Sequence, residues 1–265
     1  MTPVAVSAGT GPVVLAFPHT GTWLPEAVRG GLNPLGQALA DTDWHVDQLY
    51  AGLLPSATTV RANFHRYVID ANRDPAGVSL YPGQNTTGLV PLSAFDGKPI
   101  WREEPGEAEI AERRAQWHAP YHAELAAQLE RVRSAHGVAI LFDCHSIRSQ
   151  IPFLFDGVLP DLNVGTNSGR SCAAVLQDCT VRHCAAARSY THVVNGRFKG
   201  GWTTRDYGQP HSGIHAVQLE LAQRTYLASE AAPFAYDLAK AGRLRAVLGP
   251  LLTELEQIAL SGDLT

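Results

Sequence analysis

The chain contains little cysteine. Its 265 residues include only four cysteines, and no two of them form a C-x-x-C pair. A disulfide-stapled fold and a cysteine zinc site are therefore not expected. We predict that Cys144, Cys172, Cys179 and Cys184 are buried thiols without disulfide partners.

The chain also lacks blocks of one charge and long apolar runs. Its formal net charge is -4, without any run of Lys or Arg, so it has no electrostatic footprint for nucleic acid or an anionic membrane. No apolar run approaches the roughly 20 residues that a membrane span needs, and the amino terminus has no signal-like pattern. We expect a cytoplasmic protein that acts on a small molecule. Its oligomeric state is not readable from these patterns.

Internal repeats, heptads and low-complexity tracts are missing as well. With 45% hydrophobic and 17% charged residues, the composition is that of one folded domain spanning residues 1–265. The Gly200-Gly201 pair is not followed by Gly-Lys-Ser/Thr, which excludes a phosphate-binding loop of that type.

Apolar runs alternate with helical patterns along the chain. This alternation predicts an α/β fold with a mainly parallel sheet covered on both faces. The expected strands are 13–17, 58–60, 67–70, 138–142, 191–194 and 216–221. The expected helices are 43–53, 107–136, 171–187 and 234–260, the second kinked at Pro120 before ending at Gly137 and the last interrupted near Gly249-Pro250.

Two segments have loop composition. Residues 79–98 lack periodicity and are rich in Gly, Pro, Asn and Thr, so we expect a functional loop that covers the site. Residues 195–208 are interpreted as a flexible loop, which carries Lys199 and Arg205. A glycine-rich turn with solvated charges is the alternative for this second loop.

Polar residues stand at the ends of three apolar runs. His19 follows the first, His145 follows the run 138–142, and Glu220 lies in the last one. Carboxyl ends of parallel strands meet at one edge of a sheet, and a catalytic zinc ion takes three protein ligands plus water. Neighbouring central strands lie close enough for His19 and His145 to reach one metal. Each histidine taken alone could instead be structural.

Two other patterns are interpreted as structural. His118 and His122 are four residues apart, but Pro120 lies between them and no glutamate follows His118, so a packed or hydrogen-bonded pair is favoured over a metalloprotease motif. Cys144 adjoins His145 on a strand, where alternation directs the two side chains to opposite faces. A buried thiol is therefore expected in place of a nucleophile.

Six short segments stand in a distinctive order along the chain, at 18–22, 41–47, 66–73, 143–146, 200–208 and 218–221. This ordered set resembles the N-formylglutamate amidohydrolases, deformylases similar in fold to zinc carboxypeptidases and aspartoacylases. The resemblance implies a three-layer αβα fold with a mainly parallel, mixed sheet. It also implies a single divalent metal, zinc, although Fe, Co or Mn could occupy such a pocket.

The resemblance assigns roles to individual positions. It implies that His19 and His145 bind the metal and that Glu220 is the general base. The pair Asn72-Arg73 would grip the substrate's α-carboxylate, and Arg66 would stabilise the oxyanion, roles that suit the fixed, charged fork of arginine. Surface salt bridging is the alternative for both arginines.

The third metal ligand departs from the carboxypeptidase-like pattern. Such enzymes carry a glutamate two or three residues after the first histidine, where this chain has Gly21 and Thr22. We predict Asp43 as the third ligand, with Glu26, Asp41 and His45 as rivals. Asp43 could instead cap the helix expected at 43–53.

The expected activity is metal-dependent hydrolysis of N-formyl-L-glutamate to formate and L-glutamate, which closes one route of histidine degradation. A substrate with two carboxylates needs two cationic contacts, and Lys199 or Arg205 is predicted to meet the second. The alternatives are a hydrolase of another N-acyl amino acid or small amide, and a non-catalytic binding module of the same fold.

Overall fold

A seven-stranded mixed sheet forms the centre of the protein. The computed structural model describes residues 1–80 and 83–264. The strands are β1 (Val4–Ser7), β2 (Val13–Phe17), β3 (Thr58–Ala62), β4 (Ala139–Ile147), β5 (Leu162–Gly165), β6 (His192–Val194) and β7 (Ile214–Ala222), in the spatial order β1-β3-β2-β4-β7-β5-β6. Strands β3, β2, β4 and β7 run parallel, whereas β1 and β5 are antiparallel to their neighbours β3 and β7.

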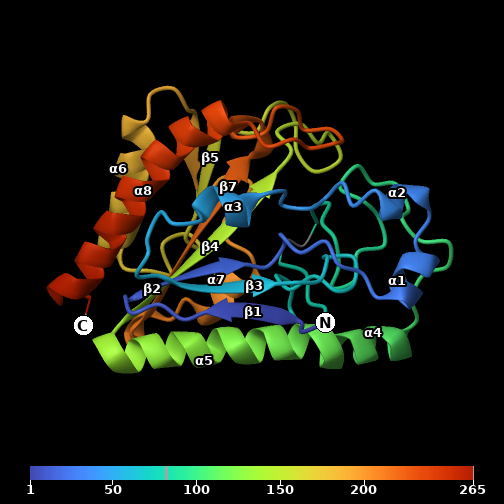
Figure 1. Ribbon diagram of the computed structural model, residues 1–265, viewed down its shortest axis with the longest axis horizontal. Coiled ribbons are helices and arrows are strands. Elements are labelled where there is room, and N and C mark those ends of the chain that lie inside the picture. The colour runs from blue at the N-terminus through green and yellow to red at the C-terminus, as the bar shows by residue number, and fades with distance from the viewer. Residues whose placement is uncertain (81–82, 265) are drawn as a thin grey trace.

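Helices cover both faces of this sheet (Figure 1). They are α1 (Glu26–Gly31), α2 (Pro34–Gln37), α3 (Val46–Tyr50), α4 (Glu107–Arg113), α5 (Ala119–His136), α6 (Ala174–Ala186), α7 (Trp202–Tyr207) and α8 (Leu238–Ser261). Short 3₁₀ turns occupy Pro210–Ser212 and Gln223–Thr225.

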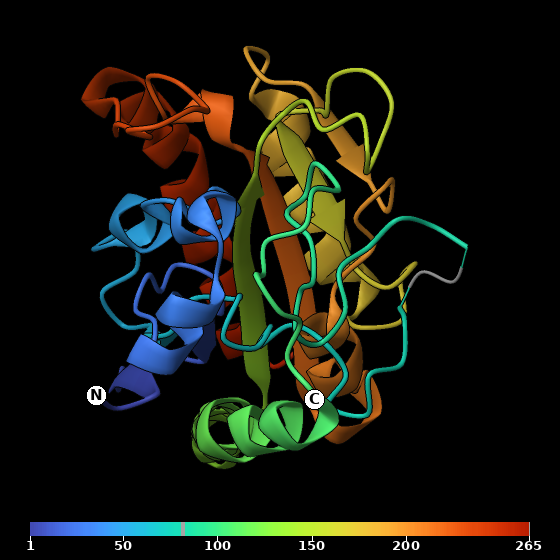
Figure 2. The same ribbon diagram turned by 90° about the vertical axis from the view of Figure 1, so that its right-hand side faces the viewer.

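The apolar core is divided by the sheet into two layers. Helices α3, α6 and α8 contribute Leu49, Leu176 and Leu248 to one, while α5 contributes Leu125 and Leu129 to the other. Figure 2 shows α5 on the opposite side of the sheet from α8, with loop segments in front of β4 and β7. The predicted three-layer α/β architecture with a mainly parallel, mixed sheet is therefore confirmed.

The long helix expected at 107–136 is present, with one local change. A π-helical turn, η1 (Arg114–His118), joins α4 to α5 immediately before Pro120. Proline lacks the N–H that the helical ladder uses, and the π-helical turn, in which the Ala119 N–H reaches back to Arg114 O, stands where the ladder meets Pro120. Gly137 closes the helix in the left-handed conformation at φ 77°, as predicted.

Three expected elements differ from the structure. Residues 67–70 form a turn where a strand was predicted, and the helix expected at 43–53 is reduced to Val46–Tyr50. The last helix begins later than expected, at Leu238 behind the N-cap Asp237, and continues through Pro250 without interruption. Burial of leucines on both sides of Pro250 holds that helix together despite the missing backbone hydrogen bond.

Several short elements were not predicted from the sequence. Strands β1 and β5 have only four residues each, and β1 is partly exposed, so neither produces a strong apolar run. Helix α7 occupies part of the segment 195–208 that was interpreted as a loop.

The cysteines agree with their prediction, because all four are buried and none forms a disulfide. Cys172 lies within the helix expected at 171–187 but just before the observed α6. Among the described residues, no helix is both long and apolar enough to cross a membrane.

Candidate active site

The carboxyl ends of β2, β4 and β7 meet at one edge of the sheet. His145 of β4 is paired in register with Glu220 of β7, and His19 lies two residues beyond the end of β2. Because side chains alternate along a strand, His145 points away from the face on which Cys144 joins the core. The sheet itself therefore brings both histidines and the glutamate to one place.

His19, Asp43 and His145 form a buried group whose potential ligand atoms all lie within 4.8 Å of one another. Asp43 Oδ2 is 3.1 Å from His145 Nδ1 and 3.7 Å from His19 Nδ1. His19 Nδ1 has no hydrogen-bond partner among the described residues. Two imidazole nitrogens and a carboxylate facing one point are the donor set of a catalytic zinc site, so these residues fit such an ion.

The far sides of both imidazoles contact carboxylates. His19 Nε2 lies 2.7 Å from Asp70 Oδ1, and His145 Nε2 lies 3.0 Å from both Asp143 Oδ1 and Asn72 Nδ2. The Asp70 carboxylate keeps the proton of His19 on Nε2, whereas Asn72 Nδ2 donates to Nε2 of His145, and these contacts fix the orientation of the two rings. Nδ1 of each ring is thereby directed towards the common point.

Asp43 is held by the surrounding protein and not by a helix. Its backbone N–H donates to His19 O at 3.1 Å, and its carboxylate accepts from Arg66 Nη2 at 3.0 Å and from the Ser146 backbone N–H at 3.1 Å. Burial by itself would raise the pKa of Asp43, but the charge of Arg66 and the proximity of His145 and His19 bring it below its ordinary value. Asp43 is thus ionised, as a metal ligand must be.

The capping role considered for Asp43 is wrong. Helix α3 begins only at Val46, and the residue before it, His45, adopts a left-handed conformation at φ 59°. The Asp43 side chain instead contacts Arg66, His145 and Ser146. Gly21 explains why the usual second ligand is missing, because a Cβ there would lie 2.5 Å from Phe64 O.

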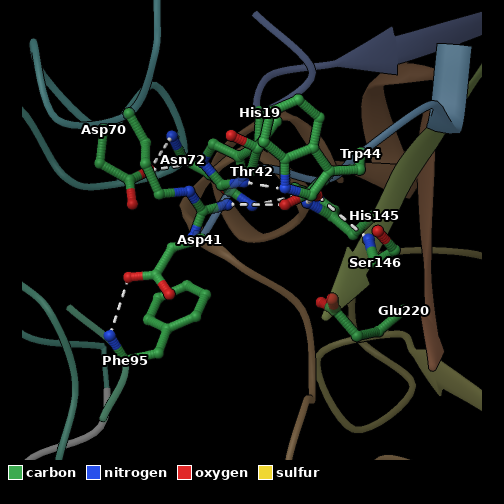
Figure 3. A network of polar contacts seen from close by, with 12 residues as sticks. His19, Asp41, Thr42, Trp44, Asp70, Asn72, Phe95, His145, Ser146 and Glu220 are labelled. Atoms are coloured by element: carbon green, nitrogen blue, oxygen red, sulfur yellow. Dashed lines mark hydrogen bonds and ion pairs between the residues drawn. The ribbon is translucent and has the colours of Figure 1, made fainter. Parts of the chain in front are cut away.

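The three rivals of Asp43 lie elsewhere. Glu26 is exposed on α1, and His45 Nε2 donates to Phe234 O at 3.0 Å. Asp41 accepts hydrogen bonds from the Tyr67 hydroxyl, the Phe95 backbone N–H and Arg148. Figure 3 shows Asp41 bonded to Phe95 and separate from His145.

Glu220 faces the same cavity as the two histidines (Figure 3). Burial raises its pKa to about 8, although the neighbouring His145 opposes that shift. Its Oε2 accepts from Gln218 Nε2 at 3.2 Å. A carboxyl group whose pKa lies near neutrality suits a residue that takes up a proton and later returns it.

The turn at 66–73 places three predicted residues on the cavity wall, namely Arg66, Asn72 and Arg73. The Asp70 carboxylate accepts from the Asn72 backbone N–H at 2.8 Å, which closes a local turn that a strand could not make. Arg73 donates from Nε to Thr87 O at 2.9 Å and from Nη2 to Thr87 Oγ1 at 3.0 Å. Neither Arg66 nor Arg73 is therefore a simple surface salt-bridge residue.

Lys199 and Arg205, which were predicted to meet the second carboxylate of the substrate, are not among the described residues that line this cavity. Lys199 is exposed, and Arg205 donates to Gly200 O at 2.9 Å and Leu80 O at 3.1 Å. The cavity is instead lined by Arg197, which the sequence analysis missed. The loop 79–98 contributes Thr86, Thr87 and Phe95 to the wall, although residues 81 and 82 lie outside the described part.

His118 and His122 form the packed pair that was predicted, with ring centroids 4.3 Å apart. Nε2 of His118 donates to Arg73 O at 3.0 Å, and Nε2 of His122 donates to Ala71 O at 2.8 Å. Because Nε2 of His122 carries the proton, its Nδ1 accepts from the Tyr207 hydroxyl at 3.0 Å. The pair therefore anchors the backbone on both sides of Asn72.

The buried His122 predicts a pH dependence of stability. Burial lowers the pKa of His122 from 6.5 to about 3. Below pH 6.5 the unfolded chain therefore binds a proton at this histidine that the native state does not bind. Between pH 6.5 and 5, the free energy of unfolding of wild type should fall by about 1.5–2 kcal/mol more than that of His122→Gln. The glutamine variant keeps a donor for Ala71 O. Urea unfolding at several pH values measures this difference. Replacing the exposed His192 provides the control, and parallel curves for wild type and His122→Gln would contradict the expectation.

A second cluster of potential ligands lies between α6 and α8, where Cys179, His183 and Glu254 come together. The guanidinium of Arg182 donates to both carboxylate oxygens of Glu254, at 2.5 and 3.1 Å. A cation already occupies the carboxylate, and burial raises the pKa of the Cys179 thiol to about 11. We therefore interpret this cluster as an ion-pair network between helices.

Sequence comparison identifies a family and individual relatives of this chain. The family described as N-formylglutamate amidohydrolase matches residues 11–227. The N-formylglutamate deformylase of Pseudomonas aeruginosa is 49% identical over 253 residues, covering 93% of each chain, and that of Pseudomonas putida is 47% identical over 249 residues, covering 92% of each.

Solved structures show the same similarity in three dimensions. The crystal structure of N-formylglutamate amidohydrolase from Ralstonia eutropha JMP134 superimposes with a TM-score of 0.82 at 25% identity, covering 99% of this chain and 100% of that one. A gene product of Agrobacterium tumefaciens shares the fold, with a TM-score of 0.68 at 23% identity over 97% of each chain. The family match over most of the chain and the close sequence relatives lead to one conclusion: this protein belongs to the N-formylglutamate amidohydrolase family.

Proposed function

We propose that this protein hydrolyses N-formyl-L-glutamate to formate and L-glutamate with the help of one bound zinc ion. The observation that carries the proposal is the buried group of His19, Asp43 and His145, whose two histidines share an arginine-lined cavity with Glu220. It is supported by near-complete alignment with proteins named N-formylglutamate deformylase. As the family resemblance implies, the reaction would close one route of histidine degradation.

His19, Asp43 and His145 would hold the ion, with Asp70 and Asp143 orienting the imidazoles from behind. A bound zinc ion supplies Lewis-acid chemistry and lowers the pKa of water towards neutrality. Mixed nitrogen and oxygen donors also accept Fe, Co or Mn, so ligand type favours zinc without selecting it absolutely.

Glu220 would move the proton. It lines the cavity and is paired in register with His145 on the neighbouring strand, which supports a role for its carboxylate in taking a proton from the attacking water. It would then deliver that proton to the amide nitrogen as the C–N bond breaks. General acid–base catalysis of this kind contributes roughly 10²- to 10⁴-fold to a rate.

The arginines would bind and orient the substrate. Arg66 lines the cavity and donates to Asp43, and its Nε has no hydrogen-bond partner among the described residues. It would therefore stabilise negative charge on the former carbonyl oxygen. Arg73 and Asn72 would hold the α-carboxylate and so place the formamide next to Glu220, which converts binding energy into orientation.

The test is formate release from N-formyl-L-glutamate, measured on the purified protein as isolated, after chelation and after zinc is restored. We expect turnover that chelation abolishes and zinc restores, because Glu220 alone activates water poorly. N-acetyl-L-aspartate and N-formyl-L-aspartate serve as comparison substrates. Preference for either of them would indicate another N-acyl amino acid hydrolase, and no turnover in a folded, zinc-loaded sample would indicate a binding protein.

A further inference from the structure

The cavity is lined by more positive than negative side chains. Arg66, Arg73 and Arg197 line its described part, and Glu220 is the one carboxylate among these lining residues. Because arginine is permanently protonated, such a cavity favours an anionic ligand. Arg66 donates to Asp43, one of the three proposed metal ligands. Arg73 and Arg197 are therefore the arginines left to bind the anionic groups of a ligand.

The backbone holds Arg197 at the cavity wall from both ends of its segment. On one side, Asn195 adopts a left-handed conformation at φ 50°, and its Oδ1 accepts from the backbone N–H groups of Thr166 and Ser168. On the other side, the Gly201 N–H donates to Gln218 Oε1 at 2.7 Å. Between these anchors, Arg197 and Phe198 line the cavity, whereas Lys199 is exposed.

Arg197 and Arg73 donate to residues that lie two positions apart in the same loop. Arg197 Nη2 donates to Asn85 O at 2.8 Å, while Arg73 contacts the backbone and hydroxyl of Thr87. Arg197 Nε also donates to Leu154 O at 3.0 Å. Two residues of extended chain span at most about 7 Å, so residues 85–87 hold both guanidinium groups a short distance apart along one wall.

Two arginines held by neighbouring parts of one loop suit a substrate with two carboxylates. The α- and γ-carboxylate carbons of glutamate are separated by four carbon–carbon bonds of about 1.5 Å each, a reach of ~5 Å. Building on the proposed function, we propose that Arg197 binds the side-chain carboxylate of the N-formyl amino acid while Arg73 binds its α-carboxylate. Arg197 then makes the site select an acidic side chain, the role expected from sequence for Lys199 or Arg205.

The experiment compares two substrates that differ only in the charge of the side chain, N-formyl-L-glutamate and N-formyl-L-glutamine. Arg197→Gln should lower kcat/KM for N-formylglutamate by about 10- to 100-fold, chiefly through KM, because one charged hydrogen-bonding group is lost. Its kcat/KM for N-formylglutamine should change little. Arg197→Lys, which keeps the charge but loses the planar fork, should lie between wild type and Arg197→Gln.

Two further variants control for charge and position. Arg170→Gln removes an exposed arginine whose hydrogen bonds go to Asn167, so both substrates should behave as with wild type. Lys199→Gln tests the rival residue directly. Equal losses on both substrates in Arg197→Gln, or a selective loss in Lys199→Gln alone, would overturn the proposal.

A binding measurement separates this proposal from the proposed function. Calorimetry should show that wild type binds glutarate more tightly than its monoamide, and that Arg197→Gln loses this preference. If the zinc-loaded protein released no formate but kept the preference for glutarate, the deformylase function would fail and the carboxylate subsite would stand. If wild type showed no preference, the subsite itself would be refuted.

Discussion

Glu220→Gln is expected to lower kcat for formate release by about 10²- to 10⁴-fold while the protein still binds zinc. Glutamine has nearly the same shape as glutamate and can keep the contact with Gln218, but it cannot accept a proton from water or pass one to the amide nitrogen. Because the α-carboxylate contacts of the substrate remain, KM should change little. The measurements are steady-state formate release and zinc content of the same preparation.

The control for this variant is Glu130→Gln, which removes a carboxylate from the exposed surface of α5. It should leave both kcat and zinc content unchanged. Turnover of Glu220→Gln close to that of wild type would remove Glu220 from the mechanism and leave the proton transfer unassigned. Loss of zinc together with activity would point instead to a role in holding the metal.

Asp43→Asn is expected to weaken zinc binding by more than about 100-fold and to abolish most of the activity with it. The substitution removes the carboxylate that lies between His19 and His145, and a neutral amide is a poor replacement for an ionised ligand. It also leaves the buried guanidinium of Arg66 without its counter-charge, so the metal-free protein should lose roughly 3–5 kcal/mol of stability. Zinc titration with a competing chelator and thermal unfolding of the metal-free form measure the two effects.

Asp41→Asn is the matched control, because Asp41 is equally buried and lies only two residues away. Its carboxylate contacts Tyr67, Phe95 and Arg148. This variant should therefore lose stability but keep zinc affinity. Retained zinc in Asp43→Asn with loss in Asp41→Asn would reverse the assignment of the third ligand.

Local patterns were enough to predict the central strands of the sheet and the polar residues near their carboxyl ends. The run Val138–Phe142 is apolar at every position because β4, which contains most of it, is buried on both faces. The change to polar residues after Phe142 marks the approach to the carboxyl end of the strand. Periodicity therefore places His145 and Glu220 near the carboxyl ends of two strands, whereas their pairing in register is a feature of the folded sheet. The same local reasoning predicted the end of the long helix at Gly137 and the buried thiols.

Patterns failed where short elements and turns decide the path of the chain. The turn at 66–73 depends on the Asp70 carboxylate accepting from the Asn72 N–H, an interaction that apolar periodicity does not contain. Helix α3 is short because His45 enters the left-handed region, which leaves Asp43 outside the helix. Neither event produces a repeat in hydrophobicity, so neither is visible in the printed sequence.

The sequence by itself determined the α/β class, the central strands near whose carboxyl ends His19, His145 and Glu220 lie, and the ordered motifs of the family. Only the tertiary structure decided that Asp43 stands beside His145, 102 positions later in the chain, and that Arg197 faces the cavity while Lys199 faces solvent. The physical reason is that strand ends are set by local burial, whereas a loop side chain is directed by hydrogen bonds to distant segments. The backbone carbonyls of Asn85 and Leu154 hold Arg197 in this way. The residues next to Arg197 in the sequence do not indicate these two hydrogen bonds.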